Sequence, residues 1–368
     1  MLVYITLLVV VGLLMMFSAS YANAYFYKGS GSYYIERQAI FAVFGFVAML
    51  IISFIPYTIL HRFAWLFFLA SWVLLFLTLF MEPINGARRW IIIANSFTLQ
   101  PSELVKFAVI LLFAHLIARQ PDKLDQFNLG FFRFALILAS IALVTLNQTH
   151  VSGTILIFGI GAIVMFAGGV RLRYFLYGGA MAIPILTFLI FTVEKFKYAL
   201  QRVLTNVNGG EASVDAYQIN QSLIAIGSGG LFGLGLGNSR QKQMYVPEAQ
   251  NDFVFSIIVE ELGFIGALLI ILLFVLFVVR GVRISLNAKD KFGALLAAGI
   301  VGQVALQSAL NMAVVTALVP NTGISLPFFS QGGTSLFILL CEMGVLLSVA
   351  RYSYVPKMET IEEEEGEE

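Results

Sequence analysis

Charged residues and cysteine are scarce in this 368-residue chain. Asp, Glu, Lys and Arg together make up 12% of it, and Cys341 is the one cysteine, whereas a soluble domain carries about 25% charged residues. A single cysteine excludes an intrachain disulfide and a cysteine-based metal cluster. The net charge of +1 gives no sign of a nucleic-acid partner. The three histidines, His61, His115 and His150, are scattered, which favours structural roles for them.

Apolar runs dominate instead, at 59% hydrophobic residues. About 20 apolar residues cross the roughly 30 Å hydrocarbon core of a bilayer. We therefore expect an all-α polytopic membrane protein with ten transmembrane helices, and a membrane domain that covers residues 1–352. The ten predicted spans are 2–21, 39–58, 61–81, 103–119, 132–147, 152–169, 173–193, 253–279, 292–318 and 333–350.

Basic residues in the short loops predict the orientation of these helices, because cytoplasmic loops carry an excess of Lys and Arg. Twelve fall on one side and four on the other. The twelve are Arg62, Arg119, Lys123, Arg133, Arg171, Arg173, Arg280, Arg283, Lys289, Lys291, Arg351 and Lys357, and the four are Lys28, Arg37, Arg88 and Arg89. Both termini are therefore expected in the cytoplasm, together with an acidic tail at 353–368. The large loop 194–252, between helices 7 and 8, is expected outside.

Asp252 stands directly before the apolar run 253–279, within the stretch YVPEAQNDFVFSIIVEELG (residues 245–263). An ionisable side chain at the mouth of a membrane helix is costly, which makes it a candidate functional residue. Aspartate also commonly caps helices by accepting a backbone N–H. Both interpretations stand, because capping leaves one carboxylate oxygen available.

A second polar region surrounds the entrance to the predicted span 103–119. It comprises Asn85-Gly86-Ala87-Arg88-Arg89-Trp90 and Gln100-Pro101-Ser102-Glu103-Leu104-Val105-Lys106. Pro101 suits the start of a helix, and Glu103 and Lys106, three residues apart, share one face of it. One interpretation is a simple intrahelical ion pair with an interfacial Trp90. The other is a binding site, because the cations of this region suit a phosphorylated ligand.

The loop 194–252 is too long for a plain connection, and loops of this length are usually functional or disordered. Residues 195–204 form a basic amphipathic segment suited to the membrane surface. Residues 217–226 predict a short helix with Gln218 and Gln221 on one face. Six glycines follow between Gly227 and Gly237. They favour tight turns and close backbone approach, because no strand precedes them and no GK[ST] ends them, as a phosphate loop requires.

The stretch Val319–Ser335 holds two prolines and three glycines and must break the helical structure at membrane depth. Irregular backbone is tolerated there only where protein covers it or a water-filled cavity adjoins it. We therefore expect this stretch, including Ser330 and Gln331, to line a cavity. The polar residues 147–154 are interpreted as a turn between two spans.

The chain resembles the SEDS family (shape, elongation, division and sporulation), membrane glycosyltransferases that include FtsW, RodA and SpoVE. The resemblance covers nearly the whole chain. It rests on GARRW with QPSELVK, on YVPEAQNDFVFSIIVEELG and on PNTGISLPFFSQGGTS. The stretch YQINQSLIAIGSGGLFGLGLGNSRQK is more similar to the FtsW and SpoVE branch. This chain departs from the family pattern at Gln148-Thr149-His150, where Gln-Pro-Asp is common, and at Gln250-Asn251, where His-Thr is common before the key Asp.

The resemblance implies a bacterial cytoplasmic-membrane enzyme that polymerises lipid II into peptidoglycan at the outer face, with inversion, for division or sporulation. Asp252 matches the family's essential acid and is the expected general base. Arg89, Lys106 and Lys242 are expected at the diphosphate. Glu103 would orient Lys106 or share Mg²⁺ or Mn²⁺ with the diphosphate, since no dedicated metal cage is visible. The remaining expected substrate-binding residues are Trp90, Gln100, Gln221, Ser330 and Gln331.

Expected partners are lipid II, a class B penicillin-binding protein, other division or elongation proteins, and membrane lipids, with no nucleic acid. The competing interpretation is a transporter that flips lipid II or another lipid-linked sugar, because a broken helix and intramembrane charges also suit transport. Polar residues gathered on the outer side alone favour the enzyme.

Overall fold

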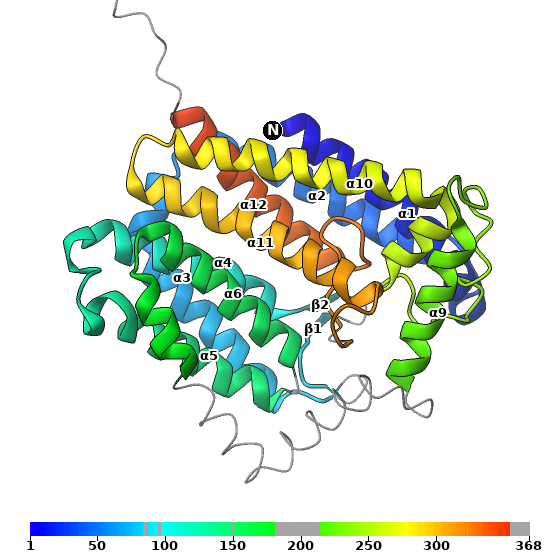
Figure 1. Ribbon diagram of the computed structural model, residues 1–368, viewed down its shortest axis with the longest axis horizontal. Helices are drawn as coiled ribbons and strands as arrows, with labels where there is room; N and C mark the ends of the chain where they lie inside the picture. The colour runs from blue at the N-terminus through cyan, green and yellow to red at the C-terminus, as the bar shows by residue number, and fades with distance from the viewer. Residues whose placement is uncertain (84–86, 95–96, 149, 181–213, 322, 354–368) are drawn as a thin grey trace, which may run out of the picture.

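The computed structural model describes residues 1–83, 87–94, 97–148, 150–180, 214–321 and 323–353, and is predominantly helical (Figure 1). Within these ranges, nine helical segments are long and apolar enough to cross a membrane. They contain α1 (Leu2–Lys28), α2 (Tyr33–Phe54), α3 (Thr58–Leu77), α4 (Pro101–Arg119), α5 (Arg133–Asn147), α6 (Val151–Gly168), α10 (Val254–Leu286), α11 (Lys291–Val315) and α12 (Gly333–Tyr352).

The shorter elements lie mostly near the connections. They are the 3₁₀ turns Thr78–Phe80 and Pro121–Lys123, the π-helical turn Asn128–Phe132, the helix α9 (Val214–Gly229), and the antiparallel strands β1 (Ile91–Ala94) and β2 (Phe97–Leu99). The two strands were not predicted. Nine of the ten expected spans are confirmed, with bounds shifted by a few residues at most ends. The span expected at 173–193 is helical from 172 to 180, and the rest of it lies outside the described residues, as does the amphipathic segment 195–204.

Helix α4 runs through the interior of the bundle (Figure 1). It is the most buried of the nine spans, and it packs against α3, α6, α11 and α12. Pro101 occupies its first turn, as expected of a residue whose missing N–H has no helical partner at that position. Glu103 lies in that first turn and Lys106 in the next, and the side chain of Lys106 is buried inside the bundle.

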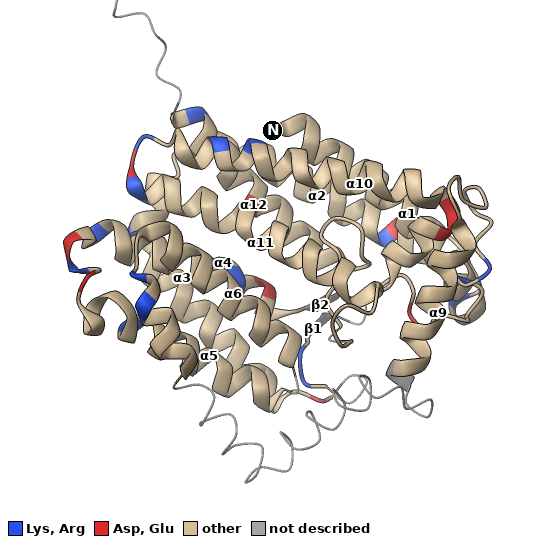
Figure 2. Cartoon of the chain, in the orientation of Figure 1, with Lys and Arg blue, Asp and Glu red and all other residues tan. Residues whose placement is uncertain are grey.

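Basic side chains gather at one end of the bundle, where α4 ends, α10 passes into α11, and α12 ends (Figure 2). The first turn of α4 and the β1–β2 hairpin lie toward the other end (Figure 1). This arrangement agrees with the loop pattern from which the cytoplasmic side is predicted. The orientation itself remains a prediction.

Helix α10 is broken at Gly263, contrary to the expectation of one continuous helix over 253–279. Gly263 has φ 70° and ψ −173°, a conformation that side chains other than hydrogen disfavour. The part after the break has about 23 residues and spans roughly 34 Å, which is enough to cross a bilayer. The part before it, which we call the inner helix (residues 254–262), has its side chains from Val254 to Glu261 buried.

The glycine-rich stretch fills the gap at this break. Phe264 N–H donates to the carbonyl of Gly230, and Leu234 N–H donates to the carbonyl of Glu260. A Cβ on Gly233 would lie 2.2 Å from the carbonyl oxygen of Glu261, so only glycine allows this approach. The expectation of tight turns and close backbone contact is confirmed.

Candidate active site

Asp252 lies at the start of the inner helix, and its side chain does not cap it. The N-cap is Phe253, and no side chain accepts a hydrogen bond there, so the capping interpretation is wrong. The carboxyl group is partly buried and faces Gly323, where an added Cβ would lie 3.1 Å from Asp252 Oδ2. The acid is thus placed against the irregular segment between α11 and α12.

Burial raises the pKa of Asp252 to about 6, with a smaller contribution from the negative charge of Glu248, while the positive charge of Arg89 lowers it. This matches the expectation that burial and a nearby cation act in opposite directions. A carboxyl group with a pKa near 6 is mostly ionised at neutral pH and is still a useful proton acceptor.

A fully buried amide joins this acid to the irregular segment. Asn311, on α11, donates from Nδ2 to the carbonyl oxygen of Asp252 at 2.7 Å and to that of Ile324 at 2.6 Å. Nearby, Gln331 N–H donates to the carbonyl of Gln250 at 2.8 Å. The chain just before α10 is therefore fastened to the irregular segment twice, at Gln250 directly and at Asp252 through Asn311.

Lys106 and Glu103 share one face of α4, as expected, and form an ion pair of 2.8 Å. The pair is more than a surface contact, because Lys106 is only 3% exposed. Lys106 Nζ also donates to Gln307 Oε1 on α11 at 3.0 Å. Gln307 in turn donates from Nε2 to the carbonyl oxygen of Ser325 at 3.0 Å. The ammonium group is thus linked across the bundle to the irregular segment.

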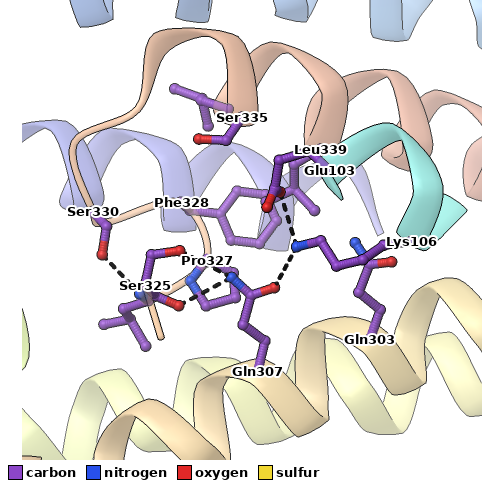
Figure 3. Close-up of a pocket in the computed structure, with 12 residues that line it drawn as sticks. Glu103, Lys106, Gln303, Gln307, Ser325, Pro327, Phe328, Ser330, Ser335 and Leu339 are labelled. Carbon is purple, nitrogen blue, oxygen red and sulfur yellow. Dashed lines mark hydrogen bonds and ion pairs between the residues drawn. The ribbon is translucent and has the colours of Figure 1, made fainter. Parts of the chain in front are cut away.

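These side chains line a small cavity (Figure 3). Its walls come from α4, α11, α12 and residues 325–330. The prediction that the stretch 319–335 lines a cavity is confirmed for Ser330, whereas Gln331 is not part of the wall. The hydroxyl of Ser330 also accepts the N–H of Leu326 at 2.7 Å, which shapes the turn. The cavity holds about 30 Å³, room for a water molecule or two.

Residues 323–325 join the two parts of the site. Gly323 faces Asp252, Ile324 shares Asn311 with it, and Ser325 walls the cavity beside Lys106 and Glu103. A chain segment three residues long therefore separates the acid from the buried cation. Movement of this segment would change both at once.

Three further expected residues lie around the β1–β2 hairpin. Arg89 and Trp90 come just before β1, and Gln100 follows β2. The hairpin is attached to α12, because Thr334 Oγ1 donates to the carbonyl of Thr98 at 2.9 Å. The positive charge of Arg89 lowers the pKa of Asp252, so Arg89 lies within electrostatic range of the acid. Its contact with a diphosphate stays a prediction.

His150 was missed by the sequence reasoning, which assigned 147–154 to a turn. It is 7% exposed, and its Nε2 lies 3.4 Å from Nε2 of Gln100. Burial, and then the charges of Arg89 and Lys106, lower the pKa of His150 to about 3, so it is neutral at physiological pH. The available signal was the polar break between two apolar spans.

The last predicted residues differ in their surroundings. Gln331 is partly buried and its Oε1 has no hydrogen-bond partner. The predicted helix 217–226 is confirmed as α9, where Gln221 is half-buried. Helix α9 borders the irregular segment, because Gln218 Oε1 accepts from Asn321 Nδ2 at 3.1 Å.

Lys242 is not placed as its expected role requires. It is buried outside the cavity lining, and its ammonium pairs with Glu261 at 2.8 Å and donates to Ser18 Oγ at 3.0 Å. The sequence could not show that a carboxylate 19 residues further on takes up this charge. This geometry favours a structural role over contact with a diphosphate.

A metal would have to be shared with a substrate. Within the described ranges, no three His, Cys, Asp or Glu side chains come together to hold a metal ion. Glu103 is the acidic side chain in the cavity wall, and Lys106 already engages it. One carboxylate with diphosphate oxygens is a usual environment for Mg²⁺, so Glu103 fits that shared role.

This fold and site define a polytopic membrane protein with a charged cavity toward one end of its helix bundle. The family model of the FtsW, RodA and SpoVE cell cycle proteins matches residues 1–355. The probable peptidoglycan glycosyltransferase FtsW of Geobacter sp. (strain M18) is 39% identical over 344 residues, 92% of each chain. Stage V sporulation protein E of Bacillus subtilis (strain 168) is 39% identical over 359 residues, 96% of this chain and 97% of that one. The chain therefore belongs to the FtsW/RodA/SpoVE family.

Solved structures agree with this assignment. A chain from a structure that describes the coordination of polymerization and crosslinking by a peptidoglycan synthase complex matches with a TM-score of 0.80 and 25% identity, over 96% of this chain and 97% of that one. Thermus thermophilus RodA matches with a TM-score of 0.70 and 26% identity, over 96% of each chain.

Proposed function

We propose that this protein is a peptidoglycan glycosyltransferase that polymerises lipid II at the outer face of the cytoplasmic membrane, in cell division or sporulation. The names of its FtsW relatives support the activity. The observation that carries the proposal is the position of Asp252, whose pKa is raised to about 6. It lies across residues 323–325 from the cavity of Lys106 and Glu103.

Asp252 acts as the general base. Its carboxylate accepts the proton of the acceptor sugar 4-hydroxyl while the oxygen attacks the anomeric carbon of the donor. The bond from that carbon to the polyprenyl diphosphate breaks, and its electron pair leaves with the diphosphate oxygen. Attack opposite to the leaving group inverts the anomeric centre. Asp252 then releases its proton to water, which a pKa near 6 allows at neutral pH.

Arg89 and Lys106 stabilise the charge that develops on the departing diphosphate. Lys106 would exchange Gln307, or Glu103, for a phosphate oxygen. Where Lys106 leaves Glu103, that carboxylate would be available to hold Mg²⁺ or Mn²⁺ together with the diphosphate. A cavity of about 30 Å³ is far below the roughly 300 Å³ or more of a typical ligand site. The segment 316–332 must therefore move outward before substrate enters.

A class B penicillin-binding protein is the proposed partner, which would crosslink the new strands. The likeness to a chain of a peptidoglycan synthase complex supports it. We expect the partner to contact the outer loops and spans and to promote the opening of the cavity. Other division or elongation proteins would assemble on the same membrane complex.

The test uses the purified full chain with its partner and labelled lipid II in detergent or vesicles. Wild type should make glycan polymer, and Asp252→Ala and Asp252→Asn should reduce it by about 100-fold or more. Asp122→Asn is the matched control, since Asp122 is exposed near the far end of α4, and it should keep wild-type activity. Polymer at the normal rate from folded Asp252→Asn would remove the base assignment. Lipid translocation without polymer would favour a transporter instead.

A further inference from the structure

Two buried charged side chains and a partly buried serine meet where α1, the 230–252 loop and the inner helix come together. Glu261 pairs with Lys242 at 2.8 Å, and both carboxylate oxygens accept from Ser18 Oγ at 2.7 Å. Lys242 Nζ also donates to Ser18 Oγ at 3.0 Å. The side chains of Lys242 and Glu261 are 5% and 0% exposed. We call Ser18, Lys242 and Glu261 the Lys242 cluster.

The neighbouring acid fastens the same loop. The carboxylate of Glu260 accepts the hydroxyl of Ser239 and, at 2.9 Å, the backbone N–H of Arg240. The carboxylates of Glu260 and Glu261, at the end of the inner helix, therefore both bind residues of the segment 239–242. A buried ion pair costs a great deal when one partner is removed, because the other charge is left without compensation.

Besides the packing of its buried side chains, the inner helix is tied by polar contacts at its two ends. Gly263 breaks the backbone between the inner helix and the rest of α10. At one end, Asn311 holds the main chain of Asp252. At the other end, about 13 Å along a helix of this length, Lys242 and Ser18 hold Glu261. A shift at Glu261 therefore moves Asp252.

We propose that Lys242, Glu261 and Ser18 are positioning residues for Asp252: the Lys242 cluster fixes the inner helix against α1 and so sets where the base stands. The inference rests on the proposed role of Asp252 as base. It replaces the expectation that Lys242 contacts the diphosphate.

Kinetics on lipid II distinguish the two roles of Lys242. Lys242→Met and Glu261→Gln should each lower kcat about 10-fold or more, with KM within about twofold, because neither side chain touches substrate. The double variant should lose no more than the worse single variant, since the two residues act through one contact. Arg240→Met, an exposed neighbour, removes a charge from the same loop and should leave kcat and KM unchanged. A raised KM with losses that multiply in the double variant, or single variants with normal kcat, would overturn the proposal.

Two further measurements cover a single variant that fails to fold. Ser18→Ala keeps the ion pair and removes one donor, and should lower kcat about two- to fivefold. In Lys242→Met or Ser18→Ala, hydrogen exchange should rise at residues 246–256 and stay unchanged in α4 and α12. Unchanged exchange at 246–256 would contradict the inference. Hydrogen exchange needs no substrate and tests the Lys242 cluster by itself. A wild-type protein that makes no polymer would instead contradict the proposed function.

Discussion

Asn311 holds Asp252 by its main chain and leaves the carboxyl group available. The amide nitrogen donates to the carbonyl oxygen of Asp252 at 2.7 Å and, in the same fork, to that of Ile324 at 2.6 Å. An amide can do this because its two N–H groups diverge. The main chain of the acid is therefore held from α11, the helix that also carries Gln307 beside Lys106.

Replacing Asn311 with leucine should displace the acid without altering it. Asn311→Leu keeps much of the volume and leaves two buried carbonyl oxygens without their donor. We expect the free energy of unfolding to fall by about 2 kcal/mol or more and kcat to fall about 10- to 100-fold. Ser308→Ala is the matched control, because Ser308 is buried on the same helix but donates only to carbonyls of that helix. Normal kcat in folded Asn311→Leu would show that Asp252 does not need this tie.

The pH dependence of polymerisation should report the pKa of Asp252. A base must be ionised, so activity should fall below a midpoint of about pH 6. Glu248→Gln removes a negative charge that raises this pKa, so the midpoint should move to lower pH. Arg89→Gln removes the positive charge that lowers it, so the midpoint should move to higher pH. Initial rates from pH 4.5 to 8.5 measure both shifts.

His150 provides the control for this profile, because its pKa of about 3 keeps it neutral over the whole range. His150→Gln should leave the midpoint in place. A midpoint that moved in this variant would show that the titrating group is not Asp252.

The stability of the protein gives a check that needs no substrate. Asp252 binds more protons folded than unfolded between about pH 4 and 6, so its carboxyl lowers stability as pH rises through that window. Asp252→Asn should then gain up to about 3 kcal/mol over wild type at pH 7 and nothing at pH 4.

Some of the site follows from sequence because its signals are local. The spacing of Glu103 and Lys106 places them on one helix face, and the prolines and glycines of 319–335 break a helix wherever it lies. Asp252 was found by the cost of a charge at the start of an apolar run. These inferences need only neighbouring residues and the membrane as solvent.

The remainder depends on contacts between distant residues. The contacts of Lys242 do not follow from its neighbours in sequence, because Glu261, which pairs with its ammonium, and Ser18, which accepts from it, lie 19 and 224 residues away. His150 joins the site because β2 brings Gln100 to it. The break at Gly263 sits inside an apolar run that also holds Gly266, and at Gly266 the helix continues. It becomes necessary only when the loop 230–235 is seen to supply the missing hydrogen bonds.

Gln307→Glu should hold the Lys106 ammonium in an ion pair and keep it from a diphosphate. Gln307 Oε1 now accepts from Lys106 Nζ at 3.0 Å, and a carboxylate of the same shape would pair with that ammonium more strongly in a buried site. It would also repel a diphosphate. We expect KM for lipid II to rise about 10-fold or more while the protein remains folded, measured by polymer formed against lipid II concentration. Gln307→Met removes the hydrogen bond from Lys106 without adding a charge, and it should lower kcat rather than raise KM. Equal KM in Gln307→Glu and wild type would exclude Lys106 from diphosphate binding.

Gly263→Ala should destabilise the protein because two requirements fall on one residue. Its φ of 70° disfavours any side chain, and an added Cβ would lie 2.3 Å from Gly233 N and 2.5 Å from the carbonyl oxygen of Leu231. Backbone cannot move aside as a flexible side chain can, so we expect a loss of about 2 kcal/mol or more. Gly227→Ala is the matched control: Gly227 lies within the last turn of α9, its φ is not in the left-handed region, and nothing lies within 4 Å of its added Cβ. That change should be neutral or stabilising by up to about 1 kcal/mol. Thermal unfolding of both variants in the same detergent measures the difference, and equal melting temperatures would mean that the break at Gly263 does not need glycine.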